Sequence, residues 1–269
     1  MKKYIFLFIS ISLILNCFGQ TSVTYFDNGM KKFNQNNFKE SIIDFTKAIK
    51  LNPNYADAYL KRGTAKNKLE DFWGAAIDLT KSIELNPNNY KSYANRAISK
   101  SSVNDLNGAI SDFNKAIELK PEDSMLYYTR GSGKGRLMDF SGAIMDFTKA
   151  IEYSPNNALF YSTRGFTKYQ LKDYRGAIAD CTKAIDLDPV DCTSYTTMAQ
   201  ANDRLENYLD AIINYTKAIN INPKDGNMYI LRGFDKMQIN DKNGACLDWS
   251  KAGELGVLEA YNYIKDYCN

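Results

Sequence analysis

The prolines of this chain are evenly spaced. The sequence of 269 residues contains six prolines, and each follows the previous one by 34 residues, at Pro53, Pro87, Pro121, Pro155, Pro189 and Pro223. A fixed period of this length is typical of an array of supersecondary units, none of which can bury its apolar face alone. Such units form a core only against their neighbours. The spacing therefore predicts a stacked array and not one central core.

Other residue types keep the same period. A tyrosine stands 28 residues before each proline, at Tyr25, Tyr59, Tyr93, Tyr127, Tyr161 and Tyr195. A small residue stands 24 before it, at Gly29, Gly63, Ala97, Gly131, Gly165 and Ala199. A large residue or cysteine stands eight before it, at Phe45, Leu79, Phe113, Phe147, Cys181 and Tyr215. A seventh copy with Tyr229, Gly233 and Trp249 lacks the proline.

These positions predict a helical hairpin in each copy. Apolar and small residues recur at helical spacing within each half. The small position allows two helix backbones to approach closely, and the large residue fills the space beside it. Proline ends the second helix because it cannot continue one. Polar residues such as Asn36, Asn37 and Asp71 form the connection between the halves.

This pattern resembles the tetratricopeptide repeat family over about residues 22–269. The resemblance implies an all-α fold in which antiparallel helix pairs stack into a right-handed α-solenoid with a concave groove. It divides the chain into a leader over 1–19, an array of seven repeats over 20–257 and a capping helix over 258–269. Repeats one to seven then cover about residues 22–55, 56–89, 90–123, 124–157, 158–191, 192–225 and 226–257.

The N-terminus has the layout of a secretory signal peptide. A basic start, MKK, precedes the apolar run YIFLFISISLIL, and Cys17 and Gly19 supply small residues for cleavage after Gly19. The run is too short for a comfortable transmembrane helix. An alternative makes Cys17 a lipid-modified first residue, although Asn16 stands where a small residue is expected. We therefore expect an exported bacterial protein, which is periplasmic, associated with the outer membrane, or secreted.

Composition excludes several functions. The formal net charge is +3, and Lys2 and Lys3 of the leader supply two of those charges. The remainder is almost neutral, so we expect no binding to nucleic acid, and contact with a membrane only if Cys17 is lipidated. The chain has no histidine, and its cysteine spacing gives no zinc signature. No catalytic constellation appears. We expect no enzyme activity, cofactor, metal or small-molecule substrate.

The stretch RGSGKGR, residues 130–136, looks at first like a phosphate-binding loop. A P-loop requires a glycine, four further residues and then Gly-Lys-Ser/Thr, which this stretch lacks. The period instead places Gly131 at the small position of a first helix. Gly133 and Gly135 are unusual there, since a helical glycine costs about 1 kcal/mol relative to alanine.

Charged residues also follow the period. Five first helices carry a basic pair four residues apart: Arg62 and Lys66, Arg96 and Lys100, Arg130 and Lys134, Arg164 and Lys168, and Arg232 and Lys236. The second helices of those repeats carry Asp78, Asp112, Asp146, Asp180 and Asp248. We call this set the ion ladder.

Two interpretations of the ion ladder compete. It forms either a basic groove for acidic ligands or a structural bridge within each repeat. Repeat six loses all three charges together and has Met198, Asn202 and Asn214. Joint loss favours bridging within a repeat, because a buried charge left without its partner is costly.

The resemblance to tetratricopeptide repeats places a ligand along the first helices. The positions expected to face the groove lie 27, 23 and 20 residues before each proline, and their residues vary between repeats. We expect contacts from Tyr128, Phe166 and Tyr169, because aromatic residues anchor interfaces, with Asn95 and Ser132 on the same face. Packing of these aromatics between repeats is the alternative. The family's carboxylate clamp is absent, since Leu60 and Thr64 occupy positions that flank Asn95.

The cysteines suggest one disulfide. Cys246 lies early in the last second helix and Cys268 ends the expected cap, so antiparallel helices would bring them together. An exported protein can hold a disulfide. We predict a Cys246–Cys268 bond, with two free thiols as the alternative, and a core thiol at Cys181.

The sequence leaves three functional hypotheses. The first is a non-catalytic scaffold for protein complexes in the bacterial cell envelope. The second is a groove that binds an extended peptide or a glycan strand. The third is a structural spacer. The expected partners are other proteins or extended peptides.

Overall fold

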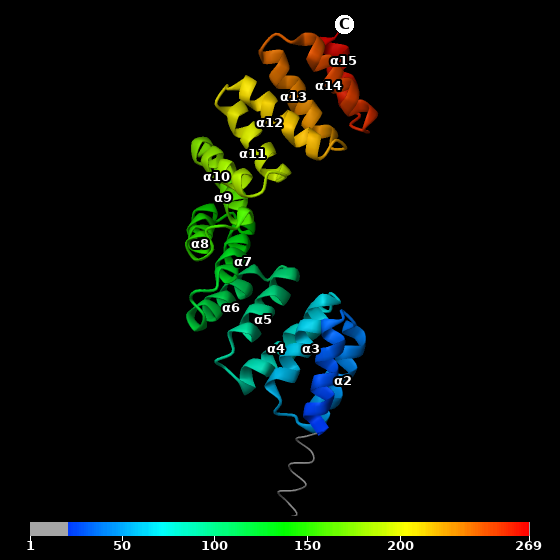
Figure 1. Ribbon diagram of the computed structural model, residues 1–269, viewed down its shortest axis with the longest axis vertical. Helices are drawn as coiled ribbons and strands as arrows, with labels where there is room; N and C mark the ends of the chain where they lie inside the picture. Colours follow the sequence, from blue (N-terminus) through cyan, green and yellow to red (C-terminus); the bar gives the residue numbers. More distant parts are fainter. Residues whose placement is uncertain (1–20, 269) are drawn as a thin grey trace, which may run out of the picture. The chain divides into compact units, whose positions relative to one another are not determined.

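The computed structural model describes residues 21–268, so the expected leader, including Cys17, lies outside the described residues. Within this range the chain forms helices joined by short turns and contains no strand, which confirms the all-α fold (Figure 1). The chain divides into two compact units, with the boundary between Leu137 and Met138.

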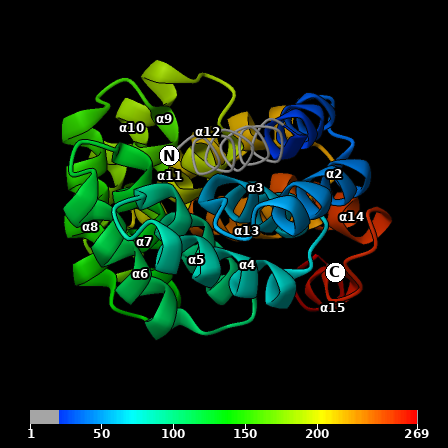
Figure 2. The same ribbon diagram turned by 90° about the horizontal axis from the view of Figure 1, so that it is seen from below.

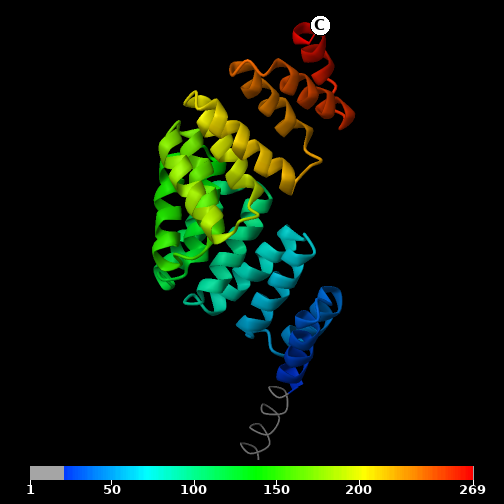
Figure 3. The ribbon, with the colours of Figure 1, turned by 45° about the horizontal axis from the view of Figure 1, so that its top comes forward.

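Each unit is a row of helices in which successive helices pack side by side. Figure 2 shows α2 beside α3 in the first unit and α9 beside α10 in the second, and Figure 3 follows the hairpins of each unit by colour. The first unit contains a helix over 21–34 and then α2 (Phe38–Leu51), α3 (Ala56–Lys68), α4 (Phe72–Leu85), α5 (Tyr90–Ser102), α6 (Leu106–Leu119) and α7 (Ser124–Arg136). The second contains α8 (Phe140–Tyr153), α9 (Ala158–Gln170), α10 (Tyr174–Leu187), α11 (Cys192–Arg204), α12 (Tyr208–Ile221), α13 (Gly226–Gln238), α14 (Lys242–Glu254) and α15 (Ala260–Tyr267).

Every hairpin turn uses one left-handed residue. These residues recur every 34 positions with φ between 61° and 65°, at Asn36, Glu70, Asn104, Met138, Lys172, Glu206 and Asn240. The next residue is the N-cap of the second helix, and its side chain accepts a capping hydrogen bond wherever it is aspartate. In repeat two, Asp71 accepts a hydrogen bond from the Gly74 amide at 2.9 Å, and a Cβ at Gly74 would lie 2.2 Å from that carboxylate. The cap therefore requires the glycine.

The second helices end in two ways. α2 ends at Leu51, and Asn52 adopts an extended conformation before Pro53, as the residue before a proline prefers. Repeat seven lacks the proline, and there α14 ends at Glu254 and is followed by Leu255 and by Gly256, which has φ +92°. This left-handed glycine is a common helix terminator.

The small and large positions of a repeat pack against each other. A Cβ added at Gly63 would lie 2.8 Å from Leu79, and one at Gly165 would lie 2.7 Å from Cys181 Sγ. Cys181 is fully buried, and burial raises the pKa of its thiol to about 12. The glycines are therefore required by the close approach of the two helices.

The structure places the ion ladder within single repeats. In repeat two, Arg62 binds both carboxylate oxygens of Asp78, at 2.6 and 2.9 Å, and Lys66 Nζ lies 2.8 Å from Asp78 Oδ2. Asp78 itself is 2% exposed. The same geometry recurs for Arg96, Lys100 and Asp112, for Arg164, Lys168 and Asp180, and for Arg232, Lys236 and Asp248. Repeat four spans both units, and the grouping of Arg130, Lys134 and Asp146 stays a prediction.

Each ladder arginine makes two further contacts. Arg62 donates from Nη1 to Thr46 Oγ1 of the preceding repeat at 3.0 Å, and its guanidinium lies 5.6 Å from the centre of the Tyr59 ring. Arg96, Arg164 and Arg232 repeat both contacts with Thr80 and Tyr93, with Thr148 and Tyr161, and with Thr216 and Tyr229. One side chain thus joins its own hairpin to the one before it.

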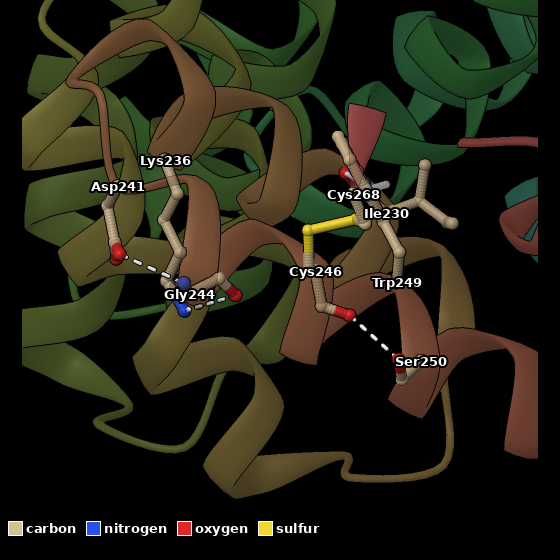
Figure 4. The surroundings of a disulfide bond; sticks show 8 residues. All are labelled: Ile230, Lys236, Asp241, Gly244, Cys246, Trp249, Ser250 and Cys268. Atoms are coloured by element: carbon tan, nitrogen blue, oxygen red, sulfur yellow. Dashed lines mark hydrogen bonds between the residues drawn. A yellow bond between two sulfur atoms is a disulfide. The ribbon is translucent and has the colours of Figure 1, made fainter. Parts of the chain in front are cut away.

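The C-terminal helix is fixed by aromatic packing and a disulfide. Trp249 of α14 is fully buried, and Tyr263 and Tyr267 of α15 pack against its ring. Cys246 of α14 forms a disulfide with Cys268, directly after α15 (Figure 4). This arrangement covers the last apolar face of the second unit.

We predict that Gly135→Ala stabilises the protein by about 0.5–1 kcal/mol, because a Cβ there meets no atom within 4 Å and glycine is a poor helix former. Gly63→Ala should instead destabilise it by about 1–3 kcal/mol, since the new methyl group overlaps Leu79. Urea denaturation followed by circular dichroism measures both. Equal shifts for the two variants would contradict the packing described here.

We also predict that Asp78→Asn lowers the unfolding free energy by about 3 kcal/mol, because it leaves two half-buried cations without a carboxylate. The chain supplies a matched control, since repeat six carries Met, Asn and Asn at these positions. The triple variant Arg62→Met, Lys66→Asn and Asp78→Asn should therefore lose less than the single variant. A triple variant that is less stable than the single one would refute a structural role.

Candidate functional site

In each unit one pair of successive first helices is in direct contact, α3 with α5 in the first unit and α9 with α11 in the second. They form a continuous face of first helices, which we call the groove face of that unit. The residues predicted to bind a ligand lie on these helices, Asn95 on α5, Tyr128 and Ser132 on α7, and Phe166 and Tyr169 on α9.

Polar groups on the groove face of the first unit bind one another. Asn67 of α3 donates to the Asn95 carbonyl at 3.1 Å and accepts from Ser99 Oγ at 2.8 Å. The Asn95 side chain donates to the Lys91 carbonyl at 2.8 Å. The Ser132 hydroxyl donates to the Tyr128 carbonyl at 2.9 Å. Asn95 and Ser132 thus have local partners, and Tyr128 is half-buried.

RGSGKGR lies in the helix α7 and forms no phosphate loop. Its last residue, Arg136, reaches across to α5, where it donates to the Ser101 carbonyl at 3.1 Å and to Ser101 Oγ at 2.9 Å. The stretch therefore connects two repeats of the first unit.

One of the three predicted groove positions is wrong in part. The position 27 residues before each proline contains Leu60 and Ser162, which are 5% and 4% exposed. Leu60 lies too deep to meet a ligand, whereas Ser162 lies at the floor of the Phe166 pocket described next. The position four residues later is more open, since Ile98 and Phe166 are each 42% exposed.

Phe166 lines a pocket on the groove face of the second unit. The pocket has a volume of about 240 Å³ and is bounded by α9, by the turn before α11 and by the start of α11. Its wall combines apolar and acidic groups: Leu159, Phe166, Asp188 and Asp191, with Thr163 and Thr193. Asp191 caps α11 through the Thr193 amide, at 3.1 Å. An apolar side chain beside a positive charge would suit this pocket.

Tyr169 lies one turn after Phe166 on α9. Its ring packs against Tyr174 at a centroid distance of 5.7 Å. Its hydroxyl also interacts with Arg204 of α11, and this interaction raises the pKa of that guanidinium. Phe166 and Tyr169 are therefore close neighbours, whereas Tyr128 belongs to the first unit.

The structure reveals one acidic residue that sequence reasoning missed. Asp235 of α13 is 2% exposed, and no donor among the described residues faces its Oδ2 atom. Its polar neighbour is the half-buried carboxyl of Asp203 on α11. Burial and this second carboxyl raise the pKa of Asp235 to about 8. A signal existed in the sequence, because the equivalent positions of repeats two to six hold small residues, Ala65, Ser99, Gly133, Thr167 and Ala201.

The described residues contain no cluster suited to a metal ion and no helix suited to span a membrane. Between residues 21 and 268, no group of three or more histidine, cysteine or acidic side chains could hold a metal ion. No helix in that range is long and apolar enough to cross a bilayer.

Comparison with known proteins identifies the repeats. A profile described as TPR repeat matches residues 29–70, and one described as Tetratricopeptide repeat matches residues 90–123, 158–191 and 193–225. Together the matches cover just over half of the chain. The comparison with curated proteins found no match.

Solved structures share the fold at low sequence identity. The C-terminal part of a TPR repeat-containing protein from Cytophaga hutchinsonii has a TM-score of 0.76 at 20% identity, over 88% of this chain and 98% of that one. A tetratricopeptide repeat protein from Parabacteroides merdae has a TM-score of 0.64 at 19% identity, over 93% and 100%.

A third structure is YrrB, whose description reads "a TPR protein with an unusual peptide-binding site". It has a TM-score of 0.60 at 21% identity, over 70% of this chain and 97% of that one. The repeat profiles, the helical hairpins and these structures agree, and the chain belongs to the tetratricopeptide repeat family.

Proposed function

We propose that the protein is an exported, non-catalytic scaffold that holds other proteins together in a bacterial cell envelope. Membership of the tetratricopeptide repeat family makes it a protein-interaction module. The disulfide between Cys246 and Cys268 is the main observation that supports the proposed location, because disulfides persist in oxidising compartments such as the periplasm. The layout of the first 19 residues favours the same location.

A second candidate function is a groove that binds an extended peptide of the partner. The Phe166 pocket favours it, since a pocket of about 240 Å³ with one exposed aromatic wall suits a single apolar side chain. YrrB, which has a similar fold, is described as having a peptide-binding site. Under this proposal the protein binds its partner through the groove face of the second unit.

Another exposed apolar surface lies on a second helix. Trp73 and Ile77 of α4 are 73% and 71% exposed and line a shallow pocket. A scaffold that uses this face would bind without the groove. The two surfaces therefore supply matched variants for one experiment.

We predict that the native protein is exported and oxidised. After alkylation of intact cells and fractionation, it should appear in the periplasmic or envelope fraction, with Cys246 and Cys268 unreactive until a reductant is added. The Cys246→Ser and Cys268→Ser double variant should lose about 3 kcal/mol of stability, because the bond closes a loop of 22 residues. A cytosolic protein with both thiols reduced would contradict the proposed location.

We further predict which surface holds the partner. Residues 20–269 serve as bait for solubilised envelope extract, with bound proteins identified by mass spectrometry. Phe166→Ala with Tyr169→Ala should weaken capture about tenfold or more, as expected for aromatic anchors. Trp73→Ala with Ile77→Ala should leave capture unchanged. The reverse result would assign the interface to α4 and overturn the groove, and retention by both double variants would leave the groove without support.

A further inference from the structure

Asp235 occupies a position built for a small residue. The equivalent residues in repeats two to six are alanine, serine, glycine or threonine. In repeat seven the carboxyl is 2% exposed, and no described donor reaches its Oδ2 atom. A buried carboxylate requires a proton or a cation to remain in such a place.

Among the described residues, no lysine or arginine acts on the Asp235 carboxyl. On α13, Arg232 and Lys236 both bind Asp248 of α14. The α12 groups that interact with Asp235 are the phenols of Tyr208 and Tyr215, which are neutral at ordinary pH. On α11, the exposed Arg204 interacts with Tyr169 of α9 and with Asp203, and both raise the pKa of its guanidinium.

The remaining partner is another acid. Asp203 of α11 is the acid that acts on Asp235, and the two carboxyl groups could share a hydrogen bond only with a proton between them. Asp203 is half-buried, so it connects the buried acid to the groove face. The pair therefore holds a proton that an incoming cation could replace.

We propose that Asp203 and Asp235 form a cation subsite on the groove face of the second unit, which takes the ammonium or guanidinium group of a Lys or Arg side chain in an extended partner segment. This proposal rests on the peptide-binding groove proposed above. It adds the chemistry of the partner, which is a segment that combines a basic residue with an apolar one.

Helix α11 sets the expected separation between the apolar and the basic residue of the partner segment. That helix contributes Thr193 to the Phe166 pocket and Asp203 to the cation subsite. Ten residues of helix separate them, which is about 15 Å at 1.5 Å per residue. An extended peptide advances about 3.3 Å per residue. The apolar and basic side chains should therefore stand about four to five residues apart.

Occupancy of the subsite should release a proton. Burial and Asp203 raise the pKa of Asp235 to about 8, so the pair holds one proton at pH 6. A bound cation favours the doubly ionised pair, and affinity should rise with pH up to about 8 and then level off. The chain has no histidine, which removes the usual source of such a dependence.

Two blocked peptides test the proposal. The first is acetyl-Leu-Ser-Gly-Ser-Lys-amide, and the second carries norleucine in place of lysine. Binding to residues 20–269 is followed by amide chemical shifts at pH 6 and pH 8.5. We expect the lysine peptide to bind more tightly, and to gain about fivefold or more between the two pH values. The norleucine peptide should bind weakly and without pH dependence.

Three variants test which residues cause the preference for lysine and its pH dependence. Asp235→Ala introduces the residue that repeats two and six carry at this position, so it should fold. It should abolish the pH dependence, and Asp203→Asn should abolish the preference for lysine. Asp186→Asn removes the same charge from an exposed position of α10 and should change neither.

Stability supplies a check that needs no peptide. The folded-state pKa of Asp235 lies above its value of 3.8 in a free carboxyl, so the folded protein holds the proton longer than the unfolded chain. Stability should therefore fall as pH rises from about 4 to about 8. Asp235→Ala should remove this fall. A parent protein whose melting temperature follows that of Asp235→Ala across this range would overturn the buried proton pair.

The peptide results separate the two proposals. Equal binding of both peptides would refute the cation subsite and leave the groove intact. Failure of both peptides to shift any resonance of α9 or α11 would refute both. A preference for lysine that survives in Asp203→Asn would place the cation elsewhere and so overturn the assignment.

Discussion

In the four repeats where the ion ladder is described, its arginine connects three helices. Arg62 binds Asp78 of its own hairpin through two hydrogen bonds, reaches Thr46 of the preceding repeat, and lies over the Tyr59 ring. In a repeat protein, stability is the sum of terms within repeats and terms between neighbours. Because one guanidinium contributes to both terms, the stability of a hairpin is coupled to its stacking on the preceding one. The spacing of 34 residues keeps this arrangement in register.

The ion ladder also determines which charged groups remain available to a ligand. Wherever a complete ladder is described, its arginine and lysine are bound to a buried aspartate, and they are not available to an acidic ligand. The second unit instead presents Asp188 and Asp191 at the Phe166 pocket and Asp203 on α11. A basic partner is therefore favoured on electrostatic grounds, although the sequence shows more basic than acidic residues on the first helices.

The periodic residues made the fold predictable from the sequence, because identical packing demands select similar residues in each repeat. The hairpins, the glycine beside Leu79 and the grouping of Arg62 with Asp78 all follow from that repetition. The left-handed turn residue was not predictable, since Met138 and Lys172 occupy it as well as asparagine. A backbone conformation imposed by the hairpin is tolerated there whatever the side chain.

The candidate site was harder to predict because binding residues depart from the period. Phe166 could be predicted as a contact residue because it is aromatic and lies at an expected groove position. The burial of Leu60 could not be predicted, because the sequence does not show how deep each helix face lies. Asp235 is the clearest case, since it breaks the rule of a small residue at a buried position. Packing gains nothing from a carboxyl there, and its burial beside Asp203 is costly. A group that destabilises the fold and is absent from the equivalent position of repeats two to six is more easily explained by a ligand than by structure.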